Sequence, residues 1–233
     1  MQTVNYQQRR SEIETYFDRT ASEAWSRLTS DAPVSRIRRT VRAGRDLMRS
    51  VILDWLPKDL KGKRILDAGC GAGNFAFEAA ERGANVLGID LSPTLVQLAR
   101  DRMPIFAGDG AVEFHVGDML DAASDEFDYL VAMDSLIHYD SSDGLNVLSS
   151  LSEKIKEGMI FTFAPRTFFL GSMHTIGRLF PRSDRAPSIE PIAETKLWNL
   201  LDEDDRLSQW SRGRAERVKS GFYISQACEL VRC

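Results

Sequence analysis

Residues 65–74 join a short apolar run to a glycine-rich turn, and this stretch constrains the fold more than any other. The apolar run I-L-D-A is followed by G-C-G-A-G-N, so that glycine occupies every second position from Gly69 onward. Glycine has no Cβ, and a ligand can therefore lie directly against the backbone. A second apolar run, 85–89, ends at Asp90, where a carboxylate can take both hydroxyls of a ribose. The stretch predicts a strand–turn–helix unit that binds a nucleoside.

The spacing of the glycines and the position of Asp67 indicate which nucleoside is bound. The dinucleotide fingerprint G-x-G-x-x-G places a pyrophosphate on a helix N-terminus. Here Gly69, Gly71 and Gly73 follow the spacing G-x-G-x-G, and Asp67 stands two residues before the first of them. An acid there would repel a pyrophosphate but attract the ammonium and sulfonium groups of S-adenosylmethionine. The pattern resembles motif I of class I S-adenosylmethionine-dependent methyltransferases, and a nicotinamide enzyme stays as the alternative.

A third segment completes the expected cofactor site. Gly117-Asp118-Met119 follows an expected strand and resembles the adenine-binding segment of the same superfamily, in which Asp118 would accept from the exocyclic amine of adenine. We therefore predict S-adenosylmethionine as the cofactor and S-adenosylhomocysteine as its product. The residues predicted to bind the cofactor are Asp67, Gly69, Gly71, Gly73, Asp90, Leu91, Asp118, Met119 and Asp134.

The chain beyond residue 63 alternates between strand and helix patterns. Strands are expected near 64–68, 85–89, 112–116, 127–132 and 158–163, and helices near 73–82, 93–102 and 143–157. This alternation is typical of a parallel sheet covered on both faces, with ligands beyond the C-terminal strand ends. Two further strands, near 206–217 and 221–231, would form an antiparallel hairpin at the edge. We predict an α/β, Rossmann-like class I methyltransferase fold with a seven-stranded, mostly parallel sheet.

Two additions to this fold are expected. Residues 1–60 form an N-terminal helical segment that caps the substrate, with helices over about 5–30 and 34–55, and residues 61–233 form the methyltransferase domain. The second helix is expected to bury an apolar side made of Ile37, Val41, Leu47, Val51, Ile52 and Trp55. Residues 165–203 follow the fifth strand and carry apolar side chains among glycines and prolines. We interpret them as a substrate lid that includes a helix near 191–203, the alternative being a helix that packs on the sheet.

Composition narrows the class of protein. The chain has 233 residues, of which 43% are hydrophobic, enough for one α/β domain with additions. No run approaches the roughly 18 apolar residues of a membrane span. Three cysteines, one of them Cys70 inside the glycine turn, argue against a disulfide framework and for a cytoplasmic location. No spacing of His, Cys, Asp and Glu suggests a protein-bound metal.

Charge is distributed unevenly along the chain. Residues 1–64 hold 14 Lys and Arg against 8 Asp and Glu, whereas residues 65–233 hold 16 against 26. A basic helix face is usually just solvated. An acidic substrate or an anionic membrane surface would also suit the arginines between 36 and 49. Nucleic acid is not expected, because the rest of the chain is acidic.

Several segments outside the glycine turn together resemble the magnesium-protoporphyrin IX O-methyltransferase family. These segments are 16–20, Trp25, 34–45, 134–139, 163–165 and 222–225. The resemblance covers essentially the whole chain and is weakest at 183–217. It implies methyl transfer from S-adenosylmethionine to one propionate carboxylate of magnesium-protoporphyrin IX, in chlorophyll or bacteriochlorophyll synthesis. The magnesium would arrive with the substrate.

The resemblance also implies site residues. His138 and Tyr16 are the expected catalytic residues, and each would hydrogen-bond the attacking carboxylate. A packed histidine and a core tyrosine are the alternatives. A flat macrocycle needs apolar walls, and its propionates suit guanidinium groups. The expected substrate-binding residues are Arg38, Arg42, Trp25, Phe168 and Met173.

The expected partners follow from the same resemblance. They are the magnesium porphyrin itself, the porphyrin-carrying subunit of magnesium chelatase, and an anionic membrane on which the protein would be peripheral. Two other functions stay open at this point. One is methylation of another small acceptor, such as a quinone or a simple carboxylic acid. The other is a non-catalytic porphyrin carrier that keeps the fold.

Overall fold

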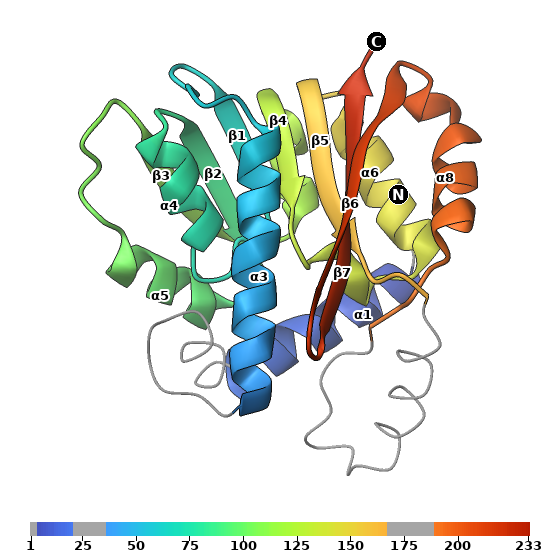
Figure 1. The fold of residues 1–233 in the computed structure, drawn as a ribbon, viewed down its shortest axis with the longest axis horizontal. Helices are drawn as coiled ribbons and strands as arrows, with labels where there is room; N and C mark the ends of the chain where they lie inside the picture. Colours follow the sequence, from blue (N-terminus) through green and yellow to red (C-terminus); the bar gives the residue numbers. More distant parts are fainter. Residues whose placement is uncertain (1–3, 21–35, 167–188) are drawn as a thin grey trace.

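The computed structural model describes residues 4–20, 36–166 and 189–233, which build one seven-stranded sheet flanked by helices (Figure 1). The strand order is β3-β2-β1-β4-β5-β7-β6, in which β7 runs antiparallel to both of its neighbours and the other pairs are parallel. The strands are β1 (Arg64–Ala68), β2 (Asn85–Asp90), β3 (Ala111–Val116), β4 (Phe127–Ala132), β5 (Ile155–Phe163), β6 (Trp210–Ser220) and β7 (Tyr223–Arg232). The predicted class I methyltransferase fold is confirmed.

Helices cover both faces of this sheet. The α-helices are α1 (Val4–Thr15), α3 (Arg36–Trp55), α4 (Asn74–Glu81), α5 (Pro93–Arg102), α6 (Ser141–Ser152) and α8 (Glu194–Asp202). The described residues also form a π-helical turn, η1 (Tyr16–Thr20), after α1 and three 3-10 turns that each follow or precede a strand, η2 (Met119–Ser124), η3 (Leu136–His138) and η5 (Asp205–Leu207). Helix α5 begins as predicted, because Ser92 accepts from Leu95 N at 3.2 Å and Pro93 occupies the first turn. Within the described ranges, no helix is both long and apolar enough to cross a membrane.

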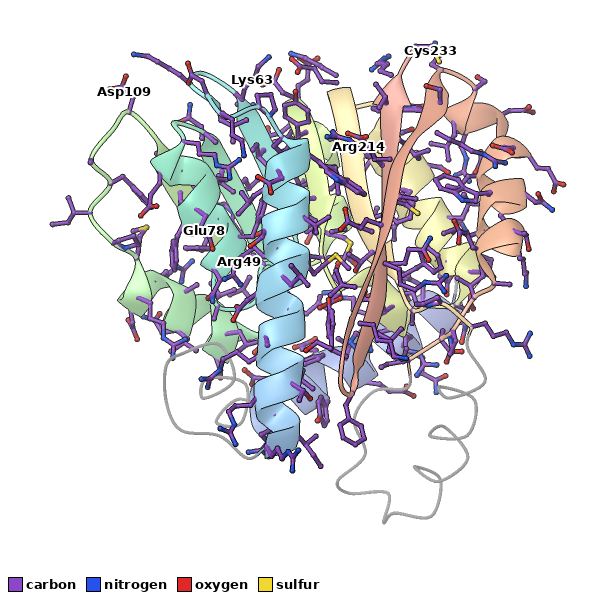
Figure 2. The ribbon with its side chains drawn as sticks, in the orientation of Figure 1. Arg49, Lys63, Glu78, Asp109, Arg214 and Cys233 are labelled. Carbon is purple, nitrogen blue, oxygen red and sulfur yellow. The ribbon has the colours of Figure 1, made fainter. Side chains whose placement is uncertain are left out.

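Helix α3 packs across the sheet and fixes the N-terminal part of the fold. Arg49 on α3 pairs with Glu78 on α4 at 2.5 Å (Figure 2). The buried face of α3 differs from the predicted one, since Ile37 and Leu47 are 54% and 52% exposed. The physical reason is Gly44, which has no side chain and lets the helix lie directly against the ring of Tyr223 on β7. The buried face therefore follows Gly44, Met48, Val51, Ile52 and Leu53.

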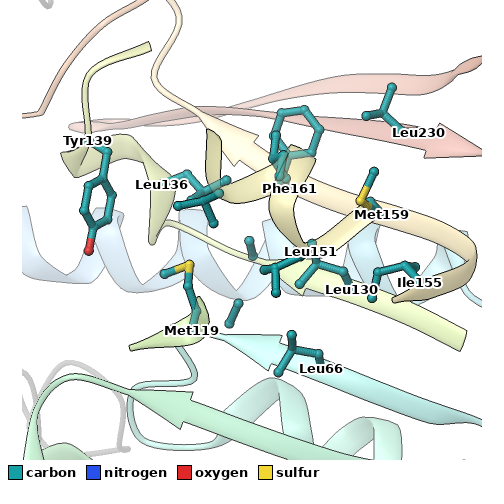
Figure 3. Packing of buried hydrophobic residues seen from close by; sticks show 14 of the residues in the cluster. Leu66, Met119, Leu130, Leu136, Tyr139, Leu151, Ile155, Met159, Phe161 and Leu230 are labelled. Carbon is teal, nitrogen blue, oxygen red and sulfur yellow. The ribbon is translucent and has the colours of Figure 1, made fainter. Parts of the chain in front are cut away.

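Two clusters of buried side chains lie on the two faces of the sheet. Successive residues of a strand point to opposite faces, so Ile65 belongs to the cluster under α3 and α4, and Leu66 to the cluster under α6 and α8. Figure 3 shows the second cluster, where Leu66, Leu130, Leu151 and Phe161 lie close together. Because of this alternation, each strand buries side chains on both faces of the sheet, as expected for a sheet that helices cover on both faces.

Two predicted boundaries are wrong. The helix expected over 143–157 ends at Ser152, and Ile155 already belongs to β5, where it pairs with Phe127 on β4. An apolar residue such as Ile155 fits a helical and a strand pattern equally well, and the neighbouring strand decides between them. The strand expected over 206–217 begins only at Trp210, because Asp204 caps the short turn η5.

The expected additions are described in part. Helix α1 ends at Thr15 and passes into η1, so the long helix predicted over 5–30 is interrupted, and residues 21–35 lie outside the described residues. Helix α8 buries Trp198 and Leu201 in the core under α6. The remainder of the predicted lid, 167–188, also lies outside the described residues. The lid over 165–203 and the division at residue 60 stay predictions.

The close packing of Gly44 generates a test of stability. A Cβ added at Gly44 would overlap the Tyr223 ring, whereas one added at Gly144 in α6 meets nothing within 4 Å. We expect Gly44→Ala to lower the free energy of unfolding by about 1–3 kcal/mol through overpacking. Gly144→Ala is the matched control and should raise it by up to about 1 kcal/mol, because alanine favours a helix. Urea unfolding followed by circular dichroism measures both, and equal stability of the two variants would contradict this packing.

Candidate functional site

The glycine turn follows β1 directly and lies against the end of β2. Gly69 N and Cys70 N donate to the Ile89 carbonyl at 2.8 and 3.1 Å. Gly69 has φ of 85°, and a Cβ there would overlap the side chain of Ser135. Gly71 and Gly73 also adopt left-handed angles, φ 53° and 80°. The turn therefore needs glycine for its backbone angles and, at Gly69, for the close approach of the segment after β4.

Asp90 holds the glycine turn at the end of β2. Its carboxylate accepts from Gly71 N and from Ser92 N, each at 2.9 Å. Burial raises the pKa of this carboxyl, and the backbone hydrogen bonds oppose that shift. Each carboxylate oxygen has a second lone pair. Asp90 can therefore fix the turn and still accept from the hydroxyls of a ribose.

Asp67 presents a buried acceptor without a partner. It lies near the end of β1, its residue is 2% exposed, and its Oδ2 accepts no hydrogen bond from the described residues. Burial, reinforced by the nearby Asp90 charge, raises the pKa of Asp67 to about 8. A buried acceptor left unsatisfied costs free energy. A cationic ligand at this position would supply the missing partner.

A cavity of about 610 Å³, its open mouth included, lies beyond the ends of β1, β2 and β4. Eight residues of the predicted site line it, namely Gly69, Gly71, Asp90, Leu91, Asp118, Met119, Asp134 and His138. The other lining residues are outside the predicted lists of cofactor-binding and catalytic residues, and they are Ile13, Phe17, Arg45, Ile89, Leu95, Gly117, Met133, Ser135 and Tyr139. The structure thus brings most of the predicted cofactor residues to one cavity.

A second cavity of about 510 Å³ adjoins the first and lies between α3 and the glycine turn. Asp67 and Arg42 line it, while Gly69 and Gly71 border both cavities. Gly73 lies instead at the start of α4, where an added Cβ would meet the rings of Phe114 and Phe77. Its visible role is helix packing.

Helix α1 lies at the wall of the first cavity, where Ile13 and Asp118 both line it. Asp118 is 1% exposed and accepts from the Tyr6 hydroxyl at 2.8 Å and from Leu120 N at 3.0 Å. The Tyr6 ring stacks on Tyr139 with 5.0 Å between centroids. Sequence reasoning missed Tyr6, whose only signal was the apolar spacing of the first helix.

His138 and Tyr16 both contact the ring of Phe17. His138 ends η3, is 9% exposed, and meets the Phe17 ring edge-on at 5.6 Å. Tyr16 packs against the same ring at 5.2 Å but does not line the cavity. Burial raises the pKa of Tyr16, and the positive charge of Arg38 opposes that shift. Of the expected substrate residues, Trp25, Phe168 and Met173 lie outside the described residues.

Asp134 follows β4 in a left-handed conformation, with φ of 54°. Its carboxylate accepts from Arg45 on α3 at 2.9 Å and from Tyr223 on β7 at 3.0 Å. Arg45 belongs to the arginine-rich segment, but nothing in the sequence distinguishes it from its neighbours. In the part of the chain that the structure describes, no cluster of three or more His, Cys, Asp or Glu side chains is suited to a metal.

These residues fit S-adenosylmethionine. The buried Asp67 oxygen suits an ammonium, Asp90 suits a ribose, and the glycine turn admits a ligand that a Cβ would exclude. The site also lies where ligands bind in open α/β sheets. Fold and site together define a class I S-adenosylmethionine-dependent methyltransferase.

Comparisons with known proteins identify the family within this class. Residues 132–232 match the family model "Magnesium-protoporphyrin IX methyltransferase C-terminus", and residues 59–168 match a general methyltransferase domain. A magnesium-protoporphyrin O-methyltransferase of Rhodobacter capsulatus is 48% identical over 97% of both chains. The Synechocystis magnesium protoporphyrin IX methyltransferase, solved with bound S-adenosylhomocysteine, is 27% identical, with a TM-score of 0.83 over 96% of this chain and 99% of that one. The chain belongs to the magnesium-protoporphyrin O-methyltransferase family.

The raised pKa of Asp67 predicts a pH-dependent affinity for the cofactor product. Below about pH 8 this carboxyl is mostly protonated in the ligand-free protein, and pairing with an ammonium requires the carboxylate. Binding of S-adenosylhomocysteine should therefore release a proton at pH 7, and its affinity should rise with pH until about 8. Titration calorimetry in buffers of different ionisation enthalpy measures the released proton.

Two variants separate Asp67 from other titrating groups. Asp67→Asn should remove the proton release and most of the pH dependence between 6.5 and about 8. Asp109→Asn, an exposed aspartate paired with Lys61, is the control and should keep both. Proton release that persists undiminished in Asp67→Asn would refute this assignment.

Proposed function

We propose that this chain transfers the methyl group of S-adenosylmethionine to one propionate carboxylate of magnesium-protoporphyrin IX, giving the monomethyl ester in chlorophyll or bacteriochlorophyll synthesis. The observation that carries the proposal is the 48% identity, over 97% of both chains, to the Rhodobacter capsulatus magnesium-protoporphyrin O-methyltransferase. The cofactor site supports it, because the glycine turn and the carboxylates of Asp67 and Asp90 occur together at one sheet edge.

We infer the following roles for the cofactor-binding residues. Asp67 pairs with the ammonium group, and Asp90 accepts from the ribose hydroxyls. Leu91, Asp118 and Met119 surround the adenine. The glycine turn and the backbone at Asp134 border the methionine part. The support is that seven of these positions line the first cavity, namely Gly69, Gly71, Asp90, Leu91, Asp118, Met119 and Asp134, and that Asp67 lines the second.

The reaction requires no strong general acid or base from the protein. The bound cofactor supplies an electrophilic methyl group, and a propionate is already ionised near neutral pH. The main contributions of the protein are alignment and exclusion of water, which together can lower a barrier by several kcal/mol. Phe17, Met133 and Leu95 give the cavity apolar walls that keep solvent away.

His138 and Tyr16 are proposed to orient the attacking carboxylate. A hydrogen bond from His138 to one carboxylate oxygen would leave the other oxygen directed at the methyl group. His138 lines the cavity, whereas Tyr16 stands behind Phe17, next to Arg38. Tyr16 therefore suits the outer part of the acceptor, where Arg38 can bind a propionate.

The remaining substrate contacts are proposed from chemistry and position. Arg38 and Arg42 would bind propionates, and Trp25, Phe168 and Met173 would cover the macrocycle. The segments 1–60 and 165–203 would act as cap and lid. Arg42 lines the cavity beside the glycine turn, which supports its part of this assignment.

Two partners are proposed on the same basis. The porphyrin-carrying subunit of magnesium chelatase would deliver the substrate, and an anionic membrane would hold the protein peripherally. Exposed Ile37 and Phe222, 54% and 44% accessible, lie near the arginines at the start of α3 and support contact with a lipid surface.

The proposed reaction is tested by titrating purified protein with magnesium-protoporphyrin IX and then adding S-adenosylmethionine. We expect the pigment to bind and to gain the mass of one methyl group, together with formation of S-adenosylhomocysteine. Zinc-protoporphyrin and a quinol serve as comparison acceptors. Transfer to the quinol but not to either porphyrin would overturn the proposed substrate.

The role of His138 is tested by replacement. His138→Gln should lower kcat by about 10- to 100-fold, because orientation of the acceptor is lost. The affinity for S-adenosylhomocysteine should change by less than about twofold. His115→Gln is the control, since His115 is an exposed histidine on β3 that contacts Glu113. A His138 variant with the kcat of the control would remove His138 from the mechanism.

A further inference from the structure

Asp134 makes hydrogen bonds with three separate elements of the fold. Arg45 on α3 donates to its Oδ2 at 2.9 Å, and Ser225 on β7 donates to its Oδ1 at 3.1 Å. The Tyr223 hydroxyl lies 3.0 Å from both oxygens. Thr162 on β5 accepts from Asp134 N at 2.7 Å. The turn after β4 is thereby connected to α3, β5 and β7 at a single residue.

The backbone of Asp134 needs such support. Its φ of 54° lies in the left-handed region, which costs a residue with a Cβ about 1–2 kcal/mol. Strain of this kind persists only where surrounding contacts determine it, and it gathers at functional sites. The carboxylate is only 5% exposed and is paired with the Arg45 guanidinium. These contacts offset the strain and keep the turn in one conformation.

The residues after Asp134 face the first cavity, the cofactor cavity of the proposed function. Ser135 lies so close to Gly69 that a Cβ on that glycine would overlap it. The turn η3 follows at once and ends at His138, which lines the cavity. A rotation at Asp134 would therefore move Ser135 away from the glycine turn and move His138 relative to the cofactor.

We propose that Asp134 is a positioning residue for methyl transfer, whose carboxylate locks the turn that carries Ser135 and His138 against the cofactor cavity. This inference rests on the proposed function and deepens it. Arg45 and Tyr223 act through Asp134, so the docking of α3 on the sheet sets the position of His138. The carboxylate is already surrounded by protein donors, and its effect on the reaction therefore passes through the turn.

The proposal is tested by removing the charge while keeping the backbone preference. Asp134→Asn suits this purpose, because asparagine tolerates the left-handed region at least as well as aspartate. We expect kcat for methyl transfer to fall at least tenfold, while the affinity for S-adenosylhomocysteine changes by less than threefold. An unchanged kcat overturns the proposal. A parallel loss of kcat and cofactor affinity overturns it as well, because that pattern indicates general damage to the site.

A second, more conservative variant tests the proposal even if Asp134→Asn does not fold. Tyr223→Phe removes one donor and keeps the ring that packs on Gly44, and it should lower kcat by three- to tenfold with cofactor affinity unchanged. Tyr129→Phe is the matched control, since the Tyr129 hydroxyl donates to the carboxylate of Glu157 at 2.5 Å elsewhere on the sheet. It should leave kcat unchanged. Equal kcat in the two tyrosine variants contradicts the proposal.

A readout independent of activity separates this inference from the proposed function. Hydrogen exchange followed by mass spectrometry should show faster exchange over residues 133–139 in Tyr223→Phe than in Tyr129→Phe. If the unaltered protein methylates no porphyrin, the proposed function fails and the exchange difference alone decides the role of Asp134. Equal exchange over 133–139 in the two variants overturns that role.

Discussion

The parallel pairing of β1 with β2 and β4 is the constraint on which the site depends. Asp67 lies opposite Gly88 on β2 and Val131 on β4, so the ends of the three strands reach one edge together. Asp90 and Asp134 follow those strand ends and are brought beside the glycine turn, although they are distant in sequence. A shift of the strand register by one residue would turn every side chain of that strand to the other face of the sheet. The register that the backbone hydrogen bonds fix therefore sets the geometry of the cavity.

The N-terminal helices, which are proposed to cap the substrate, are also structural parts of the site. Tyr6 on α1 donates to Asp118, and Arg45 on α3 pairs with Asp134. Both contacts join the N-terminal helices to carboxylates at the cavity wall. Loss of either helix would remove one side-chain donor from a buried carboxylate, and the loss of such a partner is destabilising. The stability of the cofactor cavity therefore depends on the packing of the N-terminal helices.

The sequence allowed the sheet and the cofactor residues to be predicted because both depend on local patterns. Strands β1 and β4 and the glycine turn follow from apolar runs and from glycine spacing. The roles of Arg45, Tyr223 and Tyr6 could not be predicted, because each depends on a contact between elements far apart in the chain. The end of α6 was misplaced for the same reason, since the pairing of Ile155 with Phe127 overrides its helical pattern.

The charges of the cavity explain its preference for a cation. Backbone amides donate to Asp90, and the Tyr6 hydroxyl donates to Asp118. Burial raises the pKa of Asp67, which lines the adjoining cavity. Asp134 pairs with the Arg45 guanidinium at 2.9 Å, and Asp118 pairs with the Arg10 guanidinium at 3.6 Å. Three carboxylates and one guanidinium line the first cavity, and this balance disfavours a pyrophosphate and favours a ligand with ammonium and sulfonium groups.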